Sequence, residues 1–422
     1  MNSDEKHSQW TEKQVGDEIE LCYGKGLIEK ERINGKIPVF GSNGIVGFHN
    51  KPLVKGPGVI IGRKGSVGEV NFSFVDFWAI DTTYFVKLKK RGDIRFWYYF
   101  LLTLQLNKMN SHSAVPGLNR AAVYEITKKI PENPEQQIIA DILATLDSKI
   151  DLNERMNRTL EAVGAAVFKR WFVDFEFPNT EGKPYKSTGG KMEYNEEIGR
   201  EVPAGWEVTS LENVAEFTRG FSYNGTEKNL STGEFVFITL NSIREGGGFK
   251  REFSYLTSSR LKDRHFVKEG DLVIANTHFG VGGSNEARIL GTPALVEFPS
   301  NYNQQKGCFS HHITKVTPKN KEMKDYLYYH LQHFQKKATE YKIGSFIWSL
   351  DVQGFAQNED ISIPPQNLLK NFSNLIDAFF KRKQANNRQS ETLSILRETL
   401  LPKLMSGKIR VPINKGNFEE AT

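Results

Sequence analysis

The chain has 422 residues, which is enough for two or three domains of ordinary size and excludes a single small module. Hydrophobic residues make up 38% of the chain and charged residues 25%, a mixture typical of a folded protein, and no stretch approaches the roughly 18 apolar residues of a membrane span. The net charge of +6 permits an acidic partner without requiring one. The charged N-terminus lacks the apolar segment of a secretory signal, so we expect a cytoplasmic protein without a membrane role.

The first segment, residues 5–130, is predicted to be a mixed α+β domain. It contains the β-rich runs GVIIG (58–62) and DTTYFVKL (81–88), separated by Gly-rich turns. Cys22 in this segment and Cys308 further along are the only cysteines of the chain. Two cysteines without a His cluster at ligand spacing favour reduced thiols over a disulfide framework or a zinc site, and we predict no metal site.

Residues 131–172 are predicted to form one long helix, because they contain neither Gly nor Pro between Gln136 and Val163. Steps of three and four residues define an apolar seam with a polar centre, typical of a coiled coil: Ile139, Leu143, Leu146, Ile150, Asn153, Asn157, Leu160, Gly164, Val167 and Trp171. The next segment, 173–200, is polar and rich in Gly and Pro, and it predicts a long surface connection.

The second half of the chain repeats this order. Residues 201–363, with the runs EFVFITL and DLVIA, predict a second α+β domain, and residues 364–410 predict a second long helix at an offset of 233. Near the start of each domain, Trp10, Glu20 and Gly24 match Trp206, Glu216 and Gly220 at an offset of 196. The second domain is therefore about 37 residues longer than the first.

Each helix would be a rod of roughly 55 to 60 Å with a narrow apolar stripe, so each needs a partner. The seam of the second helix consists of Phe372, Ile376, Phe379, Lys383, Asn386, Ser390, Leu393, Arg397, Leu400 and Leu404. We expect the two helices to pair antiparallel, with Asn153 and Asn386, the two midpoints, meeting and fixing the register. A parallel pair would also bring them together but would place both domains at the same end. Alternatively, the two Asn residues face solvent on bent helices.

Motifs for catalysis are missing from the sequence. No Asn or Asp is followed by Pro-Pro and an aromatic residue, as adenine methylation requires, and GRKGSVG (62–68) lacks the Lys and Ser or Thr of a phosphate-binding loop. Asp271 and Glu286 are the carboxylates a nuclease in the second domain would use. His311 and His312 are adjacent, and on a strand they would point to opposite faces and share no metal.

Polar residues beside predicted strands are candidates for DNA contacts, because Arg and Lys suit guanine edges and Asn and Gln suit adenine edges. The candidates are Ser42, Asn43, Arg63, Lys64, Ser66, His112, Asn119 and Arg120 in the first domain, and Asn241, Arg244, Asn276, Thr277, His278, Asn303, Gln304, Gln305, Ser345 and Trp348 in the second. The alternative for the GSNG loop (41–44) is a plain type I′ hairpin turn.

Residues 367–410 carry nine Lys or Arg and three acidic residues. Within them, Lys381, Arg382 and Lys383 form a basic cluster that would approach DNA phosphate or an acidic partner, or would simply be a solvated helix face.

The layout and four strings of residues, IPVFGSNGIVG (37–47), KRWFVDFEFPNTEGKPYKSTGGKM (169–192), EVPAGWEV (201–208) and ETLLPKLMSGKIRV (398–411), resemble the specificity subunit of type I restriction and modification enzymes. The resemblance covers nearly the whole chain. It implies two target recognition domains, each reading one half of a split DNA sequence, and paired helices that space them and dock two methylation subunits. It also implies that S-adenosylmethionine, ATP and Mg²⁺ bind to partner methylation and restriction/translocation subunits rather than to this chain.

We therefore predict an α+β fold with two target recognition domains separated by two long helices in an antiparallel coiled coil. The predicted function is non-catalytic recognition of an asymmetric, interrupted double-stranded DNA target, since the two domains differ in sequence and length. The alternatives are a stand-alone nuclease with its active site in the second domain and a scaffold that binds only proteins.

Overall fold

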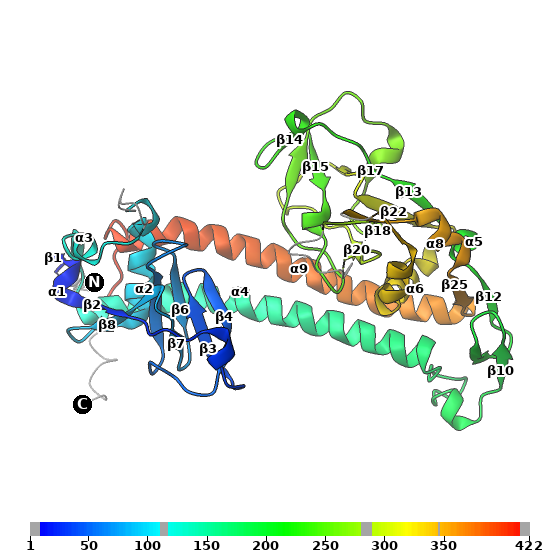
Figure 1. The fold of residues 1–422 in the computed structure, drawn as a ribbon, viewed down its shortest axis with the longest axis horizontal. Coiled ribbons are helices and arrows are strands. Elements are labelled where there is room, and N and C mark those ends of the chain that lie inside the picture. Colours follow the sequence, from blue (N-terminus) through cyan, green and yellow to red (C-terminus); the bar gives the residue numbers. More distant parts are fainter. Residues whose placement is uncertain (1–8, 110–116, 280–288, 345–346, 414–422) are drawn as a thin grey trace, which may run out of the picture. The chain divides into compact units, whose positions relative to one another are not determined.

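The computed structural model describes residues 9–109, 117–279, 289–344 and 347–413. The chain divides into two compact units (Figure 1). The first unit combines the chain up to Asn153 with the chain from Gln389 onward, and the second unit is Glu154–Arg388. The long helices α4 (Asn133–Phe168) and α9 (Gln366–Met405) each contribute one part to each unit.

The first unit contains an α+β globular part, as the sequence predicts, together with parts of both long helices. Its strands and shorter helices follow the order β1 (Thr11–Gln14), α1 (Val15–Glu18), β2 (Ile19–Tyr23), β3 (Ile37–Gly41), β4 (Gly44–His49), β5 (Gly58–Gly62), β6 (Val70–Ser73), β7 (Trp78–Ala79), β8 (Thr83–Leu88), α2 (Ile94–Thr103), α3 (Arg120–Tyr124) and β9 (Thr127–Ile130). They form a four-stranded sheet in the order β2-β8-β5-β6, a three-stranded sheet β4-β3-β7 and the pair β1-β9. Strand β5 is buried at all five positions, and the aromatic side of α2 packs with it in one core.

The second unit repeats this architecture with additions. Before its last long helix it contains β10 (Met192–Asn195), β11 (Arg200–Pro203), β12 (Glu207–Ser210), α5 (Leu211–Val214), β13 (Ala215–Arg219), β14 (Lys228–Asn229), β15 (Phe235–Ile238), β16 (Ser254–Leu256), β17 (Phe266–Val267), β18 (Leu272–Ala275), β19 (Thr277–Phe279), β20 (Pro293–Leu295), β21 (Gly307–Phe309), β22 (Ile313–Pro318), α6 (Lys324–His333), α7 (Gln335–Ala338), β23 (Lys342–Ile343), β24 (Ile347–Leu350), α8 (Val352–Asn358) and β25 (Asp360–Ile363). Its sheets have the orders β13-β22-β18-β20, β14-β16-β15-β21-β17 and β19-β24-β23, with the pairs β12-β25 and β10-β11.

Strand registers confirm the internal duplication. The pairing of β2 with β8 recurs in β13 with β22 at offsets of 196 and 230 residues, and β5 corresponds to β18 at an offset of 213. The pair β1-β9 recurs as β12-β25 at offsets of 196 and 233. The additional length of the second unit therefore enters mainly between β13 and β18 and between β18 and β22, with a small remainder between β22 and β25.

The matched glycines of the repeat, Gly24 and Gly220, are required for the same structural reason. A Cβ atom on Gly24 would meet the backbone carbonyls of Ala79 and Ile80, and a Cβ atom on Gly220 would meet those of Phe309 and Ser310. Only glycine lets the chain pass this close to the neighbouring backbone.

Within each unit, α4 and α9 run antiparallel, as predicted. In the first unit Asp147 of α4 pairs with Arg397 of α9, and further along α4 the Asn153 Nδ2 donates to Ser390 at 3.2 Å. As the residue number rises along α4, the residue number of its partner on α9 therefore falls, which shows that the two helices run antiparallel. In the second unit the same trend holds, since Asn386 donates to Asn157 at 2.8 Å.

The two midpoint asparagines are buried, with exposed fractions of 0% for Asn153 and 3% for Asn386. The alternative in which they face solvent is therefore wrong. Their bonds to Ser390 and Asn157 put both in the polar centre of the seam. The direct pairing of Asn153 with Asn386 stays a prediction.

The connection 173–200 is more structured than its polar composition predicts. Phe175 and Phe177 are buried in the core of the second unit, where their rings lie 5.5 and 5.6 Å from that of Trp206. The hairpin β10-β11 follows. The Gly and Pro residues between them set the turns, while the aromatic residues supply the burial that holds the segment in place.

Across the described ranges, none of the helices is long and apolar enough to span a membrane.

Candidate nucleic-acid interface

Seven of the first domain's eight candidates gather where β2 and β5 end and β8 begins. We call this region the first polar edge, defined by Tyr23, Ser42, Arg63, Thr82 and Arg120. The Ser42 hydroxyl donates to the Thr82 carbonyl at 2.8 Å, and the backbone N–H of Arg63 donates to the same carbonyl at 2.9 Å. The chain therefore folds two separate segments onto the turn that precedes β8.

The other candidates of this domain have distinct places at that edge. Asn43, Lys64 and Ser66 are exposed in the adjoining turns. Asn119 caps α3 by accepting a hydrogen bond from the Ala121 N–H at 2.9 Å, so its side chain already has a structural use. His112 lies outside the described residues.

The hairpin turn predicted for GSNG is present, since Gly41 pairs with Gly44 across β3 and β4. The prediction that this turn is of type I′ is wrong. That geometry requires positive φ at both central residues, whereas among the described non-glycine residues only Gln105 and Phe175 have positive φ. Within the four residues of this turn, the positive φ of +107° falls on Gly44, and the Ser42 hydroxyl donates to the Thr82 carbonyl.

Two arginines of the first polar edge stack on one aromatic ring. The guanidinium carbons of Arg63 and Arg120 lie 5.4 and 5.2 Å from the ring centre of Tyr23, whose side chain is 55% exposed. Arg63 Nε and Nη2 donate to the Asp81 carbonyl at 3.2 and 2.7 Å, and Arg120 Nη1 donates to the Leu21 carbonyl at 3.3 Å. Backbone and ring contacts thus orient both cations.

The second polar edge occupies the equivalent place in the second unit and is defined by Arg219, Asn276, Thr277, His312 and Trp348. The backbone N–H of Asn276 donates to the carbonyl of His312 at 2.9 Å, as Arg63 does to Thr82. Leu350 donates to Asn276, just as Leu118 donates to Arg63. Leu350 and Leu118 therefore hold equivalent places in the two copies.

Asn276 and Thr277 are buried and bonded to each other. The Asn276 amide donates to Thr314 Oγ1 at 2.9 Å and accepts from the Thr277 hydroxyl at 3.0 Å, which lies 3.1 Å from His312 Nδ1. Burial, with His311 and Arg219 nearby, lowers the pKa of His312 to about 4, so its ring is neutral at physiological pH. These side chains support the edge from inside.

More accessible groups lie above this network. His278 of β19 pairs across the strands with Trp348 of β24, and Lys342 Nζ lies 4.8 Å from the Trp348 ring centre. Arg219 Nε donates to the His311 carbonyl at 3.2 Å. Arg219 and Asn276 also line a recess at this edge together with Ile343 and Ser349.

Five candidates of the second domain lie elsewhere. Arg244 Nη1 pairs with Glu161 of α4 at 3.1 Å, and Asn241 is exposed in a nearby 3₁₀ turn. Asn303, Gln304 and Gln305 are exposed in the loop after β20, where Gln304 and Gln305 line a recess with Lys268 and Arg388. Ser345 and Glu286 lie outside the described residues.

Sequence reasoning missed Tyr23, Arg219 and Lys342. Tyr23 and Arg219 each directly precede a glycine of the matched pair Gly24 and Gly220. Their position directly before a matched glycine of the repeat could have identified Tyr23 and Arg219 from the sequence.

Two further expectations concern catalytic chemistry. His311 and His312 do not point to opposite faces of a strand, because they lie in the turn before β22 with ring centres 3.9 Å apart. Asp271 Oδ2 accepts from the Lys268 N–H in a turn. In the described ranges no group of three or more His, Cys, Asp or Glu is placed to hold a metal ion. Burial raises the pKa of the Cys308 thiol to about 12, so this thiol stays protonated.

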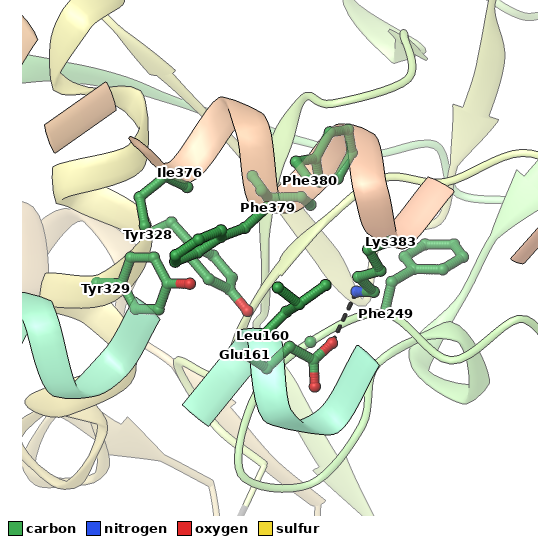
Figure 2. Close-up of a pocket in the computed structure, with 11 residues that line it drawn as sticks. Leu160, Glu161, Phe249, Tyr328, Tyr329, Ile376, Phe379, Phe380 and Lys383 are labelled. Atoms are coloured by element: carbon green, nitrogen blue, oxygen red, sulfur yellow. Dashed lines mark ion pairs between the residues drawn. The ribbon is translucent and has the colours of Figure 1, made fainter. Parts of the chain in front are cut away.

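A buried ion network attaches the second domain to the helix pair within the second unit, and Figure 2 shows its Glu161–Lys383 ion pair between the two helices. Lys383 of α9 lies 2.7 Å from Glu161 of α4 and 2.9 Å from Glu297, which follows β20 and is 1% exposed. Arg251 pairs with the other oxygen of Glu297 at 2.9 Å. Burial alone would raise the pKa of Glu297, but Lys383 and Arg251 hold it below its ordinary value. Lys383 is therefore neither solvated nor free for phosphate or an acidic partner, contrary to the three sequence interpretations.

Aromatic side chains surround this network. Tyr328 and Tyr329 of α6 line the same small cavity with Phe379 and Phe380 of α9, as Figure 2 shows. The Tyr329 hydroxyl lies where a Cβ atom on Gly164 of α4 would sit. The glycine in the predicted seam thus makes room for the domain to dock.

The first unit has its own attachment. Tyr99 of α2 donates to Asp147 of α4 at 2.6 Å, and Arg397 of α9 pairs with the other oxygen of that carboxylate at 2.7 Å. At the end of the helix pair, Arg410 and Trp10 both bond to the fully buried Glu135. In each unit, therefore, charged and aromatic contacts fix the globular part to both helices.

These features define a class: an internally duplicated α+β protein whose two copies present the same strand ends with different polar side chains and are attached to an antiparallel helix pair. The family described as type I restriction modification DNA specificity domain matches residues 7–162 and 203–393, more than half of the chain. The chain belongs to this family and is a specificity subunit of a type I restriction and modification system, which recognises a DNA sequence.

Among its relatives, the MjaIX specificity subunit of Methanocaldococcus jannaschii is 26% identical over 77% of this chain and 71% of its own length. The MjaVIII specificity subunit of the same organism is 23% identical over 95% of this chain and 93% of its own. The HindI specificity subunit of Haemophilus influenzae is 22% identical over 70% of this chain and 71% of its own. All three are named as specificity subunits rather than as catalytic ones.

The crystal structure of the S subunit of a type I restriction–modification system from M. genitalium has the same fold, with a TM-score of 0.58 at 14% identity over 96% of this chain and 98% of that one. The comparisons give no support to the stand-alone nuclease or the protein-only scaffold.

Proposed function

We propose that the first and second polar edges each read one half of an asymmetric, interrupted double-stranded DNA target, and that the chain itself performs no catalysis. The observation that carries the proposal is one scaffold with two sets of side chains. Tyr23, Arg63 and Arg120 at the first edge occupy the positions of Arg219, Asn276 and Val352 at the second. Equivalent strand ends that present different side chains are expected to recognise different base sequences.

The paired helices recruit two methylation subunits, and restriction/translocation subunits join the full complex. S-adenosylmethionine, ATP and Mg²⁺ bind to those partner subunits, and the complex works in the cytoplasm. The supporting observations are the long helices α4 and α9 with their exposed outer positions, such as Leu152, Ile395 and Leu396, which are 43%, 66% and 43% exposed. Exposed apolar side chains on a charged helix suit a protein partner.

A domain exchange tests the proposal. The full chain is co-expressed with its methylation subunits in cells without other adenine methylation, and methylated positions are mapped across the genome. Replacing residues 5–130 with those of a relative should change one half of the methylated motif and leave the other half unchanged. Replacing residues 201–363 is the reciprocal control and should change only the other half. A continuous motif, or one altered throughout by either exchange, would contradict the proposal.

A further inference from the structure

A backbone carbonyl holds the Arg63 guanidinium by one of its two edges. A guanidinium has a side edge, formed by Nε–H and one Nη2–H, and an end edge, formed by one N–H of each Nη. The Asp81 carbonyl accepts from Nε at 3.2 Å and from Nη2 at 2.7 Å, so it occupies the side edge. The end edge of Arg63 stays available for two parallel hydrogen bonds.

No carboxylate neutralises this group or its neighbour. Across the part of the chain that the structure describes, neither Arg63 nor Arg120 forms an ion pair with Asp or Glu. Both guanidinium carbons lie within 5.4 Å of the Tyr23 ring centre. Two uncompensated cations beside a half-exposed aromatic ring favour a flat, electron-rich ligand, because the cations attract acceptor atoms and the ring covers a planar face.

A base suits this site better than a phosphate. Phosphate contacts carry no sequence information, so two copies of one scaffold would serve them with the same side chains. Here Arg120 corresponds to Val352, and Tyr23 to Arg219. The second unit also places an arginine on the equivalent carbonyl, that of His311, but Arg219 comes from a different strand, and no aromatic ring replaces Tyr23. Positions that differ on a shared scaffold are those expected to specify bases.

We propose that Arg63 reads a guanine through its end edge, an inference that rests on the proposed function. Tyr23 positions the Arg63 guanidinium, and Arg120 is the second cation at the site. The guanine O6 and N7 atoms are two acceptors in one plane, which matches the two N–H groups of an arginine end edge. The half-site read by residues 5–130 then contains at least one G·C pair at a fixed position.

The test uses the full chain with its methylation subunits and the genome-wide methylation map. Arg63→Lys keeps the charge but loses the planar pair of donors, so the preference for guanine at one position should fall about 5- to 150-fold, while the other half of the motif stays unchanged. Tyr23→Leu should relax the same position, whereas Tyr23→Phe, which keeps the ring, should preserve it. Arg91→Gln, an exposed arginine beyond the other end of β8, is the matched control and should leave the motif unaltered.

The outcomes separate the two claims. Thermal unfolding of each purified variant shows whether it folds, and the unchanged half of the motif reports an intact complex within the same experiment. If the wild-type chain directs methylation to no motif, the proposed function fails and this inference fails with it. If a two-part motif appears but the half assigned to residues 5–130 lacks guanine, or if Arg63→Lys lowers methylation equally at all sites without relaxing any position, only the guanine assignment is overturned.

Discussion

Lys383 is the residue whose removal should cost most stability in the helix-to-domain contact. Its ammonium lies 2.9 Å from Glu297, which is 1% exposed, and 2.7 Å from Glu161. In Lys383→Met, Glu297 keeps Arg251 at 2.9 Å but loses the second of its two cationic partners, which lies equally close. Removing one partner of a buried ion pair costs about 3 to 5 kcal/mol, and the remaining arginine places this variant near about 3 kcal/mol.

Urea unfolding followed by tryptophan fluorescence measures this loss. With a slope of about 2 kcal/mol per molar urea, the midpoint of the second unit should fall by about 1.5 M. Lys381→Met, an exposed lysine on the same helix, is the matched control and should change the free energy of unfolding by less than about 0.5 kcal/mol. The double variant Lys383→Met/Glu297→Gln should recover part of the loss, because it also removes the buried Glu297 charge that Lys383 no longer offsets, while Glu161 keeps Arg244 as a partner.

Equal midpoints for Lys383→Met and Lys381→Met would refute the reasoning, because they would show that the Lys383 charge is solvated. A double variant less stable than Lys383→Met by the full cost of a second buried group would also contradict it, since the two residues would then act independently.

Three further predictions concern stability. The pKa of Glu297 is held below its ordinary value, so the stabilisation it contributes is present above about pH 4.5 and is lost as pH falls through the lowered pKa; urea midpoints measured from pH 7 to pH 3 should therefore fall more steeply for the wild type than for Glu297→Gln. Gly24→Ala should destabilise the first unit by about 1 to 3 kcal/mol, because its Cβ would meet the Ile80 carbonyl, while Gly26→Ala, whose Cβ would meet nothing within 4 Å, should not; similar midpoints for the two would count against the close approach. Asn119→Ala should lower the unfolding free energy by about 1 kcal/mol through loss of the α3 cap, and Asn119→Asp should retain it; an unaffected midpoint in Asn119→Ala would show that the cap contributes nothing.

Pattern and repetition in the sequence determined much of this protein. Strand β5 coincides with GVIIG, and the long helices fall within the Gly- and Pro-poor segments, because β-branched runs and helical spacing of apolar residues act locally. The matches at offsets of 196 and 233 established the duplication, and the strand registers follow both. A duplicated sequence folds twice by the same local rules, so the sequence alone predicts the repeated architecture.

Tertiary structure alone decided which polar residues meet. Tyr23, Arg63 and Arg120 are far apart in sequence and converge only because β2, β8 and β5 are neighbours in one sheet. The sequence placed Lys383 in a basic helix face, but packing buries it between two carboxylates. The sequence made Asn276 a candidate DNA contact, but its amide forms hydrogen bonds inside the domain. Composition gives the charge of a side chain, but its partner depends on which elements pack beside it, and burial then decides whether that charge is paired or available to a ligand.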